Sequence, residues 1–358
     1  MNGKNGNSQT ETRYYSCYMI NCFELHFYGR LGEHKKIVRQ CCEKDDVLLS
    51  MELEQTGEET FKSFKALNEQ AILEGVLHRL DRHYTKKCME CDHYALRNWK
   101  RDGLVHRVNI SIYPAPCQLK CIYCNIGTHN QNNYCIESVK KDFDIVLDCI
   151  SYATENGQIA SDAVWQISSG EISIHSFKDK ILELVKGKVV TFYTNCVLYD
   201  DEISIILQSN PNAKINLSID AGTSVTWKKV KGVDNFNDVV DNVVKYSKSC
   251  ISPNQITLKY ILLPGCNTSD ADFDSLIEII KTLGVKHITV SRDYVKKYNM
   301  LLEADKQLIA DAGRLLVKLN INKIGFDMYD FTRHERQEIL SQSQQAQILS
   351  IREIYFSS

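Results

Sequence analysis

The sequence has no run of apolar residues long enough to cross a bilayer, so it does not indicate an integral membrane protein. It also has no large excess of either charge. The formal net charge is −2 at pH 7, which gives no electrostatic reason to expect a nucleic acid or a membrane surface as a partner. Residues 1–16 lack the apolar core of a signal peptide. We therefore expect a polar, disordered leader and a cytoplasmic protein.

Cysteine, in contrast, is abundant, with 14 residues in a chain of 358. In a reducing compartment cysteines rarely form a disulfide framework, so this number favours metal binding. Nine of the cysteines lie in the first 124 residues. The scattered later ones are expected to be small buried residues. The length allows one large domain and a smaller one.

From residue 104 onward, short β-rich runs alternate with helical patterns. The predicted strands are residues 106–113, 163–168, 188–194, 214–220, 256–263, 287–292 and 323–329. The helical stretches between them include residues 137–157, 176–187, 201–210, 236–249 and 271–284. This α/β alternation predicts a parallel sheet with right-handed crossovers, and about six or seven such units make a complete or partial barrel. The alternative is an open doubly wound sheet, but no glycine-rich turn follows the first strand.

The residues before the predicted barrel have a different pattern. A hairpin-like segment, 23–40, is followed by a helix-like segment, 59–84. We read them as a small cysteine-rich module that is separate from the barrel. The predicted parts are a leader (1–16), the N-terminal module (17–103), an α/β barrel (104–330) and a C-terminal helical extension (331–358).

The segment PAPCQLKCIYCNIG, residues 114–127, carries Cys117, Cys121 and Cys124 with the spacing CxxxCxxC. It follows the first predicted barrel strand directly. We therefore place it on the C-terminal rim, where barrels of this class hold their active sites. Three thiolates fill three positions of a metal site and leave one open, as a reactive centre requires. The alternative is a structural zinc site with His129 as the fourth ligand.

This motif, with Tyr123 just before the third cysteine, resembles that of the radical S-adenosylmethionine (SAM) superfamily. The resemblance implies a partial (β/α)6 TIM-like barrel. It also implies that Cys117, Cys121 and Cys124 hold a 4Fe–4S cluster whose open iron is chelated by SAM, and that Tyr123 contacts the adenine. An electron from the cluster would cleave SAM to methionine and a 5′-deoxyadenosyl radical, which abstracts a hydrogen atom from the substrate.

The end of the second predicted strand resembles another motif of the family. It reads SSGE and is similar to the family's GGE, which contacts the methionine ammonium of SAM. Gly170 and Glu171 match this motif, whereas Ser169 replaces a glycine. A carboxylate beside an ammonium group would make a charge-assisted hydrogen bond. The alternative is that Glu171, like Asp220 at the end of the fourth strand, is a helix-capping or solvated carboxylate.

The ends of the third and fourth strands resemble the family as well. The third ends in YTNC, similar to the family's TNG: Thr194 and Asn195 match, and Cys196 replaces the glycine. The fourth, NLSIDAGT, places Ser218 and Asp220 where the resemblance implies contacts with the ribose hydroxyls or the methionine carboxylate. Polar groups at four consecutive strand ends would lie on one rim, together with the three cysteines.

The cysteines before the barrel resemble the ligands of an auxiliary cluster in SPASM and twitch domains. In those families the module usually follows the barrel, whereas here it precedes it. The resemblance implies a second 4Fe–4S cluster with four ligands from Cys22, Cys41, Cys42, Cys88 and Cys91. The alternative is a structural zinc site that uses the same residues, or Cys88 and Cys91 with His83 or His93.

Families with such modules often oxidise or crosslink peptides, and some dehydrogenate sugar-like alcohols. The resemblance therefore implies a peptide or small polar substrate, and a low-potential electron donor such as flavodoxin or ferredoxin. A second interpretation is a radical epimerase in which Cys196 or Cys266 donates the hydrogen atom. An interpretation of another class is a metal or SAM sensor that binds without turnover.

Overall fold

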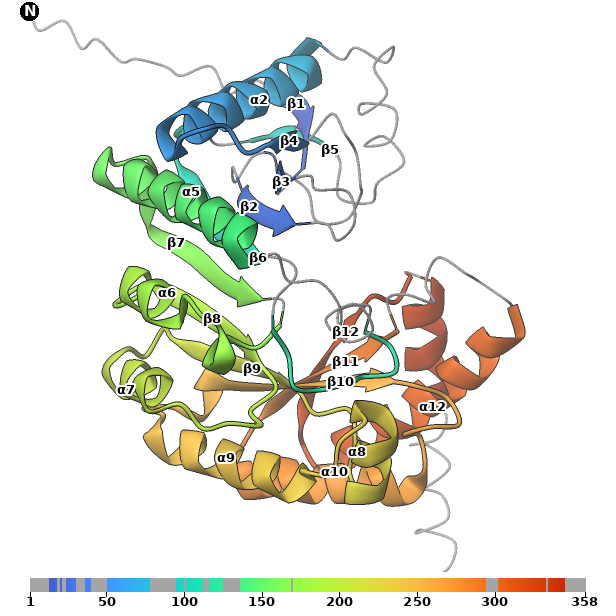
Figure 1. Cartoon of the computed structure of the whole chain (residues 1–358). Helices are drawn as coiled ribbons and strands as arrows, with labels where there is room; N and C mark the ends of the chain where they lie inside the picture. Colours follow the sequence, from blue (N-terminus) through green and yellow to red (C-terminus); the bar gives the residue numbers. More distant parts are fainter. Residues whose placement is uncertain are drawn as a thin grey trace, which may run out of the picture. The chain divides into compact units, whose positions relative to one another are not determined.

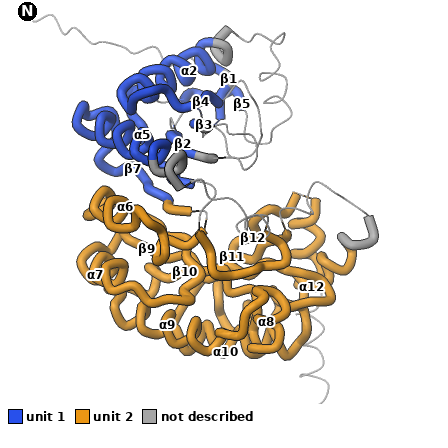
Figure 2. Tube along the Cα trace, viewed as in Figure 1, with its two compact units in different colours: residues 1–113, 134–166 blue, residues 114–133, 167–358 orange. Residues whose placement is uncertain are grey.

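The computed structural model describes residues 13–17, 20, 24–29, 36–39, 50–77, 95–99, 101–111, 116–124, 136–168, 170–293, 302–332 and 334–344. The chain divides into two compact units (Figure 2). The first unit contains residues 1–113 and 134–166, and the second contains residues 114–133 and 167–358. Both units combine helices with strands.

The second unit is built on parallel strands (Figure 1). These are β8 (Val189–Thr194), β9 (Lys214–Ser218), β10 (Ile256–Leu262), β11 (His287–Arg292) and β12 (Gly325–Tyr329). Each pairs in parallel with the next strand in the chain, so their order follows the sequence without reversal. A doubly wound sheet needs a point at which the order reverses. The predicted α/β fold of the partial-barrel type is therefore confirmed, and the doubly wound alternative is wrong.

The two faces of this sheet differ in polarity because side chains alternate between them. On one face Leu217, Leu258 and Ile288 are fully buried. On the other face Ser218 and Lys259, which lie opposite each other in the register of β9 and β10, are half-buried. The core of this unit therefore lies on one side of the sheet, and the other side carries polar groups.

Helices connect the strands of the second unit. They are α6 (Lys178–Leu184), α7 (Asp201–Ser209), α8 (Ser224–Lys231), α9 (Phe236–Ser249), α10 (Asp270–Leu283) and α12 (Leu302–Ile321), with short 3-10 turns η2 (Ile172–Ile174) and η3 (Pro253–Gln255). In α10 the Ser269 side chain accepts from the Asp272 amide at the start, and Gly284 ends the helix with φ 67°. Phe273 of α10 packs against Tyr260 of β10, with ring centroids 6.2 Å apart.

Most sequence predictions for this unit are confirmed. Strands β8 to β12 and helices α6, α7, α9 and α10 lie where alternation and periodicity predicted them. Helices α8 and α12 were not predicted. In the predicted C-terminal extension, 331–358, the structure describes a helix over residues 334–344.

The first unit contains strands in the order β7-β6-β2-β3-β4 and a separate two-stranded ribbon, β1-β5. They are β1 (Arg13–Ser16), β2 (Glu24–Gly29), β3 (Lys36–Arg39), β4 (Ser50–Glu52), β5 (Ala95–Asn98), β6 (Val105–Ser111) and β7 (Ile159–Ser168), whose last two residues belong to the second unit. The predicted hairpin is confirmed, since β2 and β3 pair antiparallel. On its other side β2 pairs in parallel with β6, which the sequence did not indicate.

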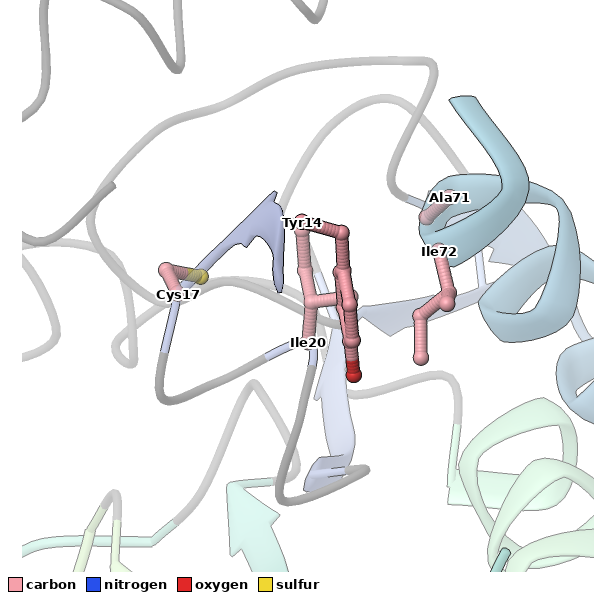
Figure 3. Close-up of a cluster of buried hydrophobic side chains, with 5 residues drawn as sticks. All are labelled: Tyr14, Cys17, Ile20, Ala71 and Ile72. Carbon is pink, nitrogen blue, oxygen red and sulfur yellow. The ribbon is translucent and has the colours of Figure 1, made fainter. Parts of the chain in front are cut away.

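Two helices complete this unit, α2 (Gly57–Leu77) and α5 (Ile136–Glu155), and they match predicted helical stretches. The side chains of Tyr14, Ile20, Ala71 and Ile72 form a small buried cluster, with Ala71 and Ile72 on α2 (Figure 3). Cys17 also belongs to this apolar cluster and is 8% exposed.

The compact units do not coincide with the predicted boundary between residues 103 and 104. Strands β6 and β7 and helix α5 group with the N-terminal residues. The division at that boundary into an N-terminal cysteine-rich module and a barrel stays a prediction. Over the described residues, no helix combines the length and apolar character needed to span a membrane.

Candidate functional site

The CxxxCxxC segment is described over residues 116–124, in the second unit. Cys117, Cys121 and Cys124 are half-buried, and none of them is in a disulfide. Burial raises the pKa of Cys117, and it raises that of Cys121 to about 11 even though Lys231 opposes the shift. The thiolate is the form that binds metal, so ligation at these cysteines has to release protons.

The end of α8 holds this cysteine segment by backbone contacts. The Lys120 amide donates to the Lys231 carbonyl at 2.9 Å, and the Ile122 amide donates to the Val230 carbonyl at 3.0 Å. The helix ends at Gly232, which has φ 74°. A Cβ atom at Gly232 would lie 2.9 Å from Lys120 Cβ and 3.1 Å from its carbonyl oxygen. Glycine is therefore required here both for its φ and for the close approach of the cysteine segment.

A fully buried lysine connects the same segment to the end of β9. Lys231 Nζ donates to Asp220 Oδ2 at 2.5 Å and to Tyr123 OH at 2.7 Å. Its third bond goes to the Ser218 carbonyl at 2.8 Å, so all three ammonium donors have acceptors. Tyr123 OH also donates to Asp220 Oδ2 at 2.5 Å, and Asp220 Oδ1 accepts from the Ile261 amide at 2.6 Å.

The lysine and the aspartate of this network are 2% and 0% exposed. Burial lowers the pKa of Lys231, but the Asp220 carboxylate and the sulfurs of Cys121 and Cys117 together more than offset it, so the pKa is raised overall. The ammonium also lies over the rings of Tyr123, at 5.2 Å, and Trp227, at 5.4 Å. Lys231 therefore remains charged, and both oxygens of Asp220 are bonded within the protein.

Glu171 is a second buried carboxylate, and it too is saturated by donors. It accepts from the Ser173 amide (3.2 Å) and hydroxyl (3.0 Å) and from the Thr194 hydroxyl (2.9 Å). The Asn195 amide donates to its other oxygen at 2.6 Å. Burial raises the pKa of Glu171, and these four donors oppose the shift. Because the Glu171 amide donates to the Pro116 carbonyl at 2.7 Å, this network also contacts the cysteine segment.

Asn195 reaches the first cysteine itself. Its carboxamide Nδ2 lies 3.6 Å from Cys117 Sγ and 3.3 Å from Gln118 Oε1. The following residue, Cys196, has φ 54° and is fully buried, which explains why glycine suits this position in the TNG motif. Its sulfur lies in the interior.

A family model identifies this part of the chain. The model of the Radical SAM superfamily matches residues 114–280, which include the cysteine segment and both buried carboxylates. The chain contains a radical SAM domain.

The individual proteins that this chain resembles have low sequence identity to it. A protein named "Probable GTP 3′,8-cyclase" from Saccharolobus islandicus is 25% identical over 178 residues, 48% of this chain and 52% of that protein. The chain thus spans about half the length of the curated relatives it matches.

Two solved structures have a fold similar to that of this chain. SuiB from Streptococcus suis, bound to precursor peptide SuiA, is 14% identical, covers 91% of this chain and 75% of that chain, and has a TM-score of 0.47. A radical SAM methyltransferase from Sphaerobacter thermophilus is 15% identical. The match covers 60% of this chain and 63% of the methyltransferase, with a TM-score of 0.41.

The radical SAM domain brings together most of the residues singled out from the sequence. Two bonded groups meet at the cysteine segment, one around Glu171 and one around Asp220. They contain Tyr123, Glu171, Thr194, Asn195, Asp220 and the carbonyl of Ser218. Gly170, with φ 75°, precedes Glu171 directly. Cys266 is half-buried and packs against the same small apolar cluster as Tyr123.

Several predicted residues lie outside the described part of the chain. They are the auxiliary-cluster candidates Cys22, Cys41, Cys42, Cys88 and Cys91, together with His83, His93, His129 and Ser169. Conversely, sequence reasoning missed Lys231 and Gln118. Lys231 is one of three lysines in the last turn of α8, and no motif distinguishes it from the two solvent-facing ones.

The residues of the radical SAM domain fit a 4Fe–4S cluster, because they place hydrogen-bond donors beside Cys117. Within the described ranges, no three His, Cys, Asp or Glu side chains gather as a single-ion site would need. A 4Fe–4S cubane makes no such demand, because its thiolates bind different irons. Gln118 Nε2 is buried and has no hydrogen-bond partner among the described groups. Such a donor is expected to have an acceptor, and the sulfurs of a cluster beside Cys117 would supply one.

Proposed function

We propose that this protein is a radical SAM enzyme that acts on a peptide or a small polar substrate by oxidation or crosslinking. One observation carries the proposal. The CxxxCxxC segment of the radical SAM domain is joined by hydrogen bonds to the ends of β8 and β9 and to the end of α8. The chain thereby presents three thiols on a rim that buried charges hold in place, as a reactive centre requires.

Cys117, Cys121 and Cys124 would hold the 4Fe–4S cluster. When bound, the cluster and SAM would supply the 5′-deoxyadenosyl radical that abstracts hydrogen from the substrate. The chain's own part is to position these groups. Lys231 and Gly232 keep the cysteine segment against α8, and Pro116 accepts from the Glu171 amide at its other end.

Tyr123, Gly170, Glu171, Thr194, Asn195, Ser218 and Asp220 are the proposed SAM-binding residues. The carboxylates of Glu171 and Asp220 already accept several hydrogen bonds each. We propose that they order the loops around SAM, and that a direct bond to SAM would replace one of these contacts. Ser218 differs, because its side chain is half-buried on the polar face of the sheet. Its hydroxyl is the better candidate for a ribose contact.

We further propose an auxiliary 4Fe–4S cluster in the N-terminal residues, ligated by four of Cys22, Cys41, Cys42, Cys88 and Cys91. Metal analysis tests it. The anoxically reconstituted protein should bind about eight irons per chain, and Cys88→Ser/Cys91→Ser about four. Equal iron and sulfide in both proteins, or zinc in place of iron, would contradict the auxiliary cluster.

The epimerase alternative depends on a cysteine that substrate can reach. Cys196 is fully buried, whereas Cys266 is half-buried and packs against the same apolar cluster as Tyr123, so Cys266 is the better candidate for the hydrogen-atom donor. In heavy water an epimerase would incorporate deuterium into its product, and Cys266→Ala would abolish the incorporation. Oxidation would incorporate none.

Anoxic turnover tests the proposal as a whole. The reconstituted protein, given dithionite and SAM, should form 5′-deoxyadenosine, and flavodoxin or ferredoxin should replace dithionite as the low-potential donor. Cys121→Ser should abolish this product. Cys250→Ser, a half-buried cysteine at the end of α9, should not change it. If the wild-type protein binds SAM but forms no 5′-deoxyadenosine, the protein is a sensor and not an enzyme.

A further inference from the structure

The carboxamide of Asn195 has a defined orientation beside the first cysteine. The Val197 amide donates to Asn195 Oδ1 at 2.9 Å, which identifies the oxygen end of the group. The amino end therefore points the other way, where Nδ2 lies 3.6 Å from Cys117 Sγ and 3.3 Å from Gln118 Oε1. A short turn thus aims an N–H donor at a sulfur.

Gln118 supports this orientation from the cysteine segment. Its Oε1 is the second acceptor of the Asn195 amino group, so the two carboxamides lie against each other beside Cys117. The remaining donor of Gln118, Nε2, is buried and has no hydrogen-bond partner among the described residues. Leaving a buried donor unsatisfied is unfavourable, so an electronegative partner is expected beside Nε2.

The electrostatics of Cys117 show why such donors matter. The Leu119 amide and the Asn195 carboxamide both donate to the Cys117 sulfur, and the buried Glu171 carboxylate lies close enough to repel negative charge on it. The N–H groups are therefore what offset that repulsion when the sulfur carries negative charge. A hydrogen bond to a ligand sulfur also stabilises the more negative, reduced state of an iron–sulfur cluster.

We propose that Asn195, supported by Gln118, donates a hydrogen bond to the Cys117 thiolate and thereby raises the reduction potential of the cluster. This rests on the proposed cluster at Cys117, Cys121 and Cys124. The step concerned is a one-electron reduction in which the cluster gains the electron and the external donor, dithionite in the test, loses it. Asn195 transfers no proton or electron, so it is a positioning residue.

The test is an anoxic redox titration followed by electron paramagnetic resonance. The signal of this cluster is the one that changes when SAM is added. In Asn195→Leu the ratio of reduced to oxidised cluster at a fixed potential should fall about tenfold, a shift of about 59 mV to more negative potential. In Gln118→Leu the shift should have the same sign and be smaller, because Asn195 remains. Asn212→Leu, which removes an exposed asparagine before β9, should leave the midpoint unchanged.

The outcomes separate the two proposals. If the wild-type protein binds no iron and sulfide, the proposed cluster fails. If clusters form and neither Asn195→Leu nor Gln118→Leu moves the midpoint, the cluster stands and the role of Asn195 is overturned. If Asn195→Leu does not load, Gln118→Leu decides: an unchanged midpoint overturns the inference, and a shift to more negative potential supports it.

Discussion

Replacing Lys231 by methionine is the sharpest test of the network beneath the cysteine segment. Methionine keeps the length and the apolar stem of lysine and removes only the ammonium. The change leaves Asp220 buried without its cation. It also deprives Tyr123 OH and the Ser218 carbonyl of a donor.

The expected magnitude follows from burial. Removing one partner of a buried ion pair costs about 3–5 kcal/mol, because the remaining charge is uncompensated. Asp220 would keep the bonds from Tyr123 OH and the Ile261 amide, so we expect the free energy of unfolding to fall by about 3 kcal/mol, the lower end of that range. In Lys231→Met/Asp220→Asn both charges are gone, and the loss should be smaller than in the single variant.

The assay is urea unfolding of the cluster-free protein, followed by circular dichroism. Hydrogen exchange of peptides from residues 116–124 locates the effect. Helix α8 provides the control. Lys228 pairs with Asp234 at 3.1 Å, and both side chains are 64% exposed. Lys228→Met should therefore change the free energy of unfolding by less than about 1 kcal/mol.

The reasoning is refuted if Lys231→Met costs no more than Lys228→Met. It also fails if the double variant is less stable than Lys231→Met, because the buried carboxylate would then not be the source of the loss. A stable Lys231→Met protein that binds full iron and sulfide would show that the network does not hold the cysteine segment.

Three further predictions concern the same site. Gly232→Ala and Gly284→Ala both place a side chain on a residue with positive φ, which costs about 1–2 kcal/mol. Only the new methyl group at Gly232 would collide with Lys120, so only Gly232→Ala should lower the uptake of iron and sulfide. Equal uptake in the two variants would contradict this. In Glu171→Gln one carboxylate oxygen becomes an amino group, which in either orientation of the side chain faces a backbone N–H, that of Ser173 or that of Asn195. The free energy of unfolding, measured by urea titration, should fall by about 1–3 kcal/mol. If Glu171 only bound SAM, the stability would be unchanged. In the native protein a thiol alkylating reagent should label Cys266 faster than Cys196, because Cys196 is fully buried and burial raises its pKa; peptide mass spectrometry measures both rates.

Much of the fold was accessible from the sequence because the signals are local. Strand β9 alternates polar and apolar residues, β8 is rich in β-branched and aromatic residues, and α10 has a capping serine and a terminal glycine. Helix α8 shows where local signals fail. Its sequence, SVTWKKVK, suggests an exposed, basic segment, yet Trp227 and Lys231 are buried. Whether a lysine is buried depends on what packs over it, and spacing does not encode that.

The pairing of β2 with β6 was not predicted either, because it too depends on contacts that form only in the folded protein. The sequence indicates that residues 24–29 form a strand, but not which strand they join. That choice depends on the hydrogen-bonding groups that remain open at a sheet edge after the chain has folded.

By itself, the sequence determined the three candidate ligands, Cys117, Cys121 and Cys124, and the strand–helix order that places them after a strand. Spacing and periodicity are properties of the chain before it folds. Only the tertiary structure decided which charges are buried around them. Lys231 bonds to Tyr123 across 108 residues of sequence, and Asn195 to Cys117 across 78. A buried charge is stable only beside its partner, and folding alone brings such distant partners together.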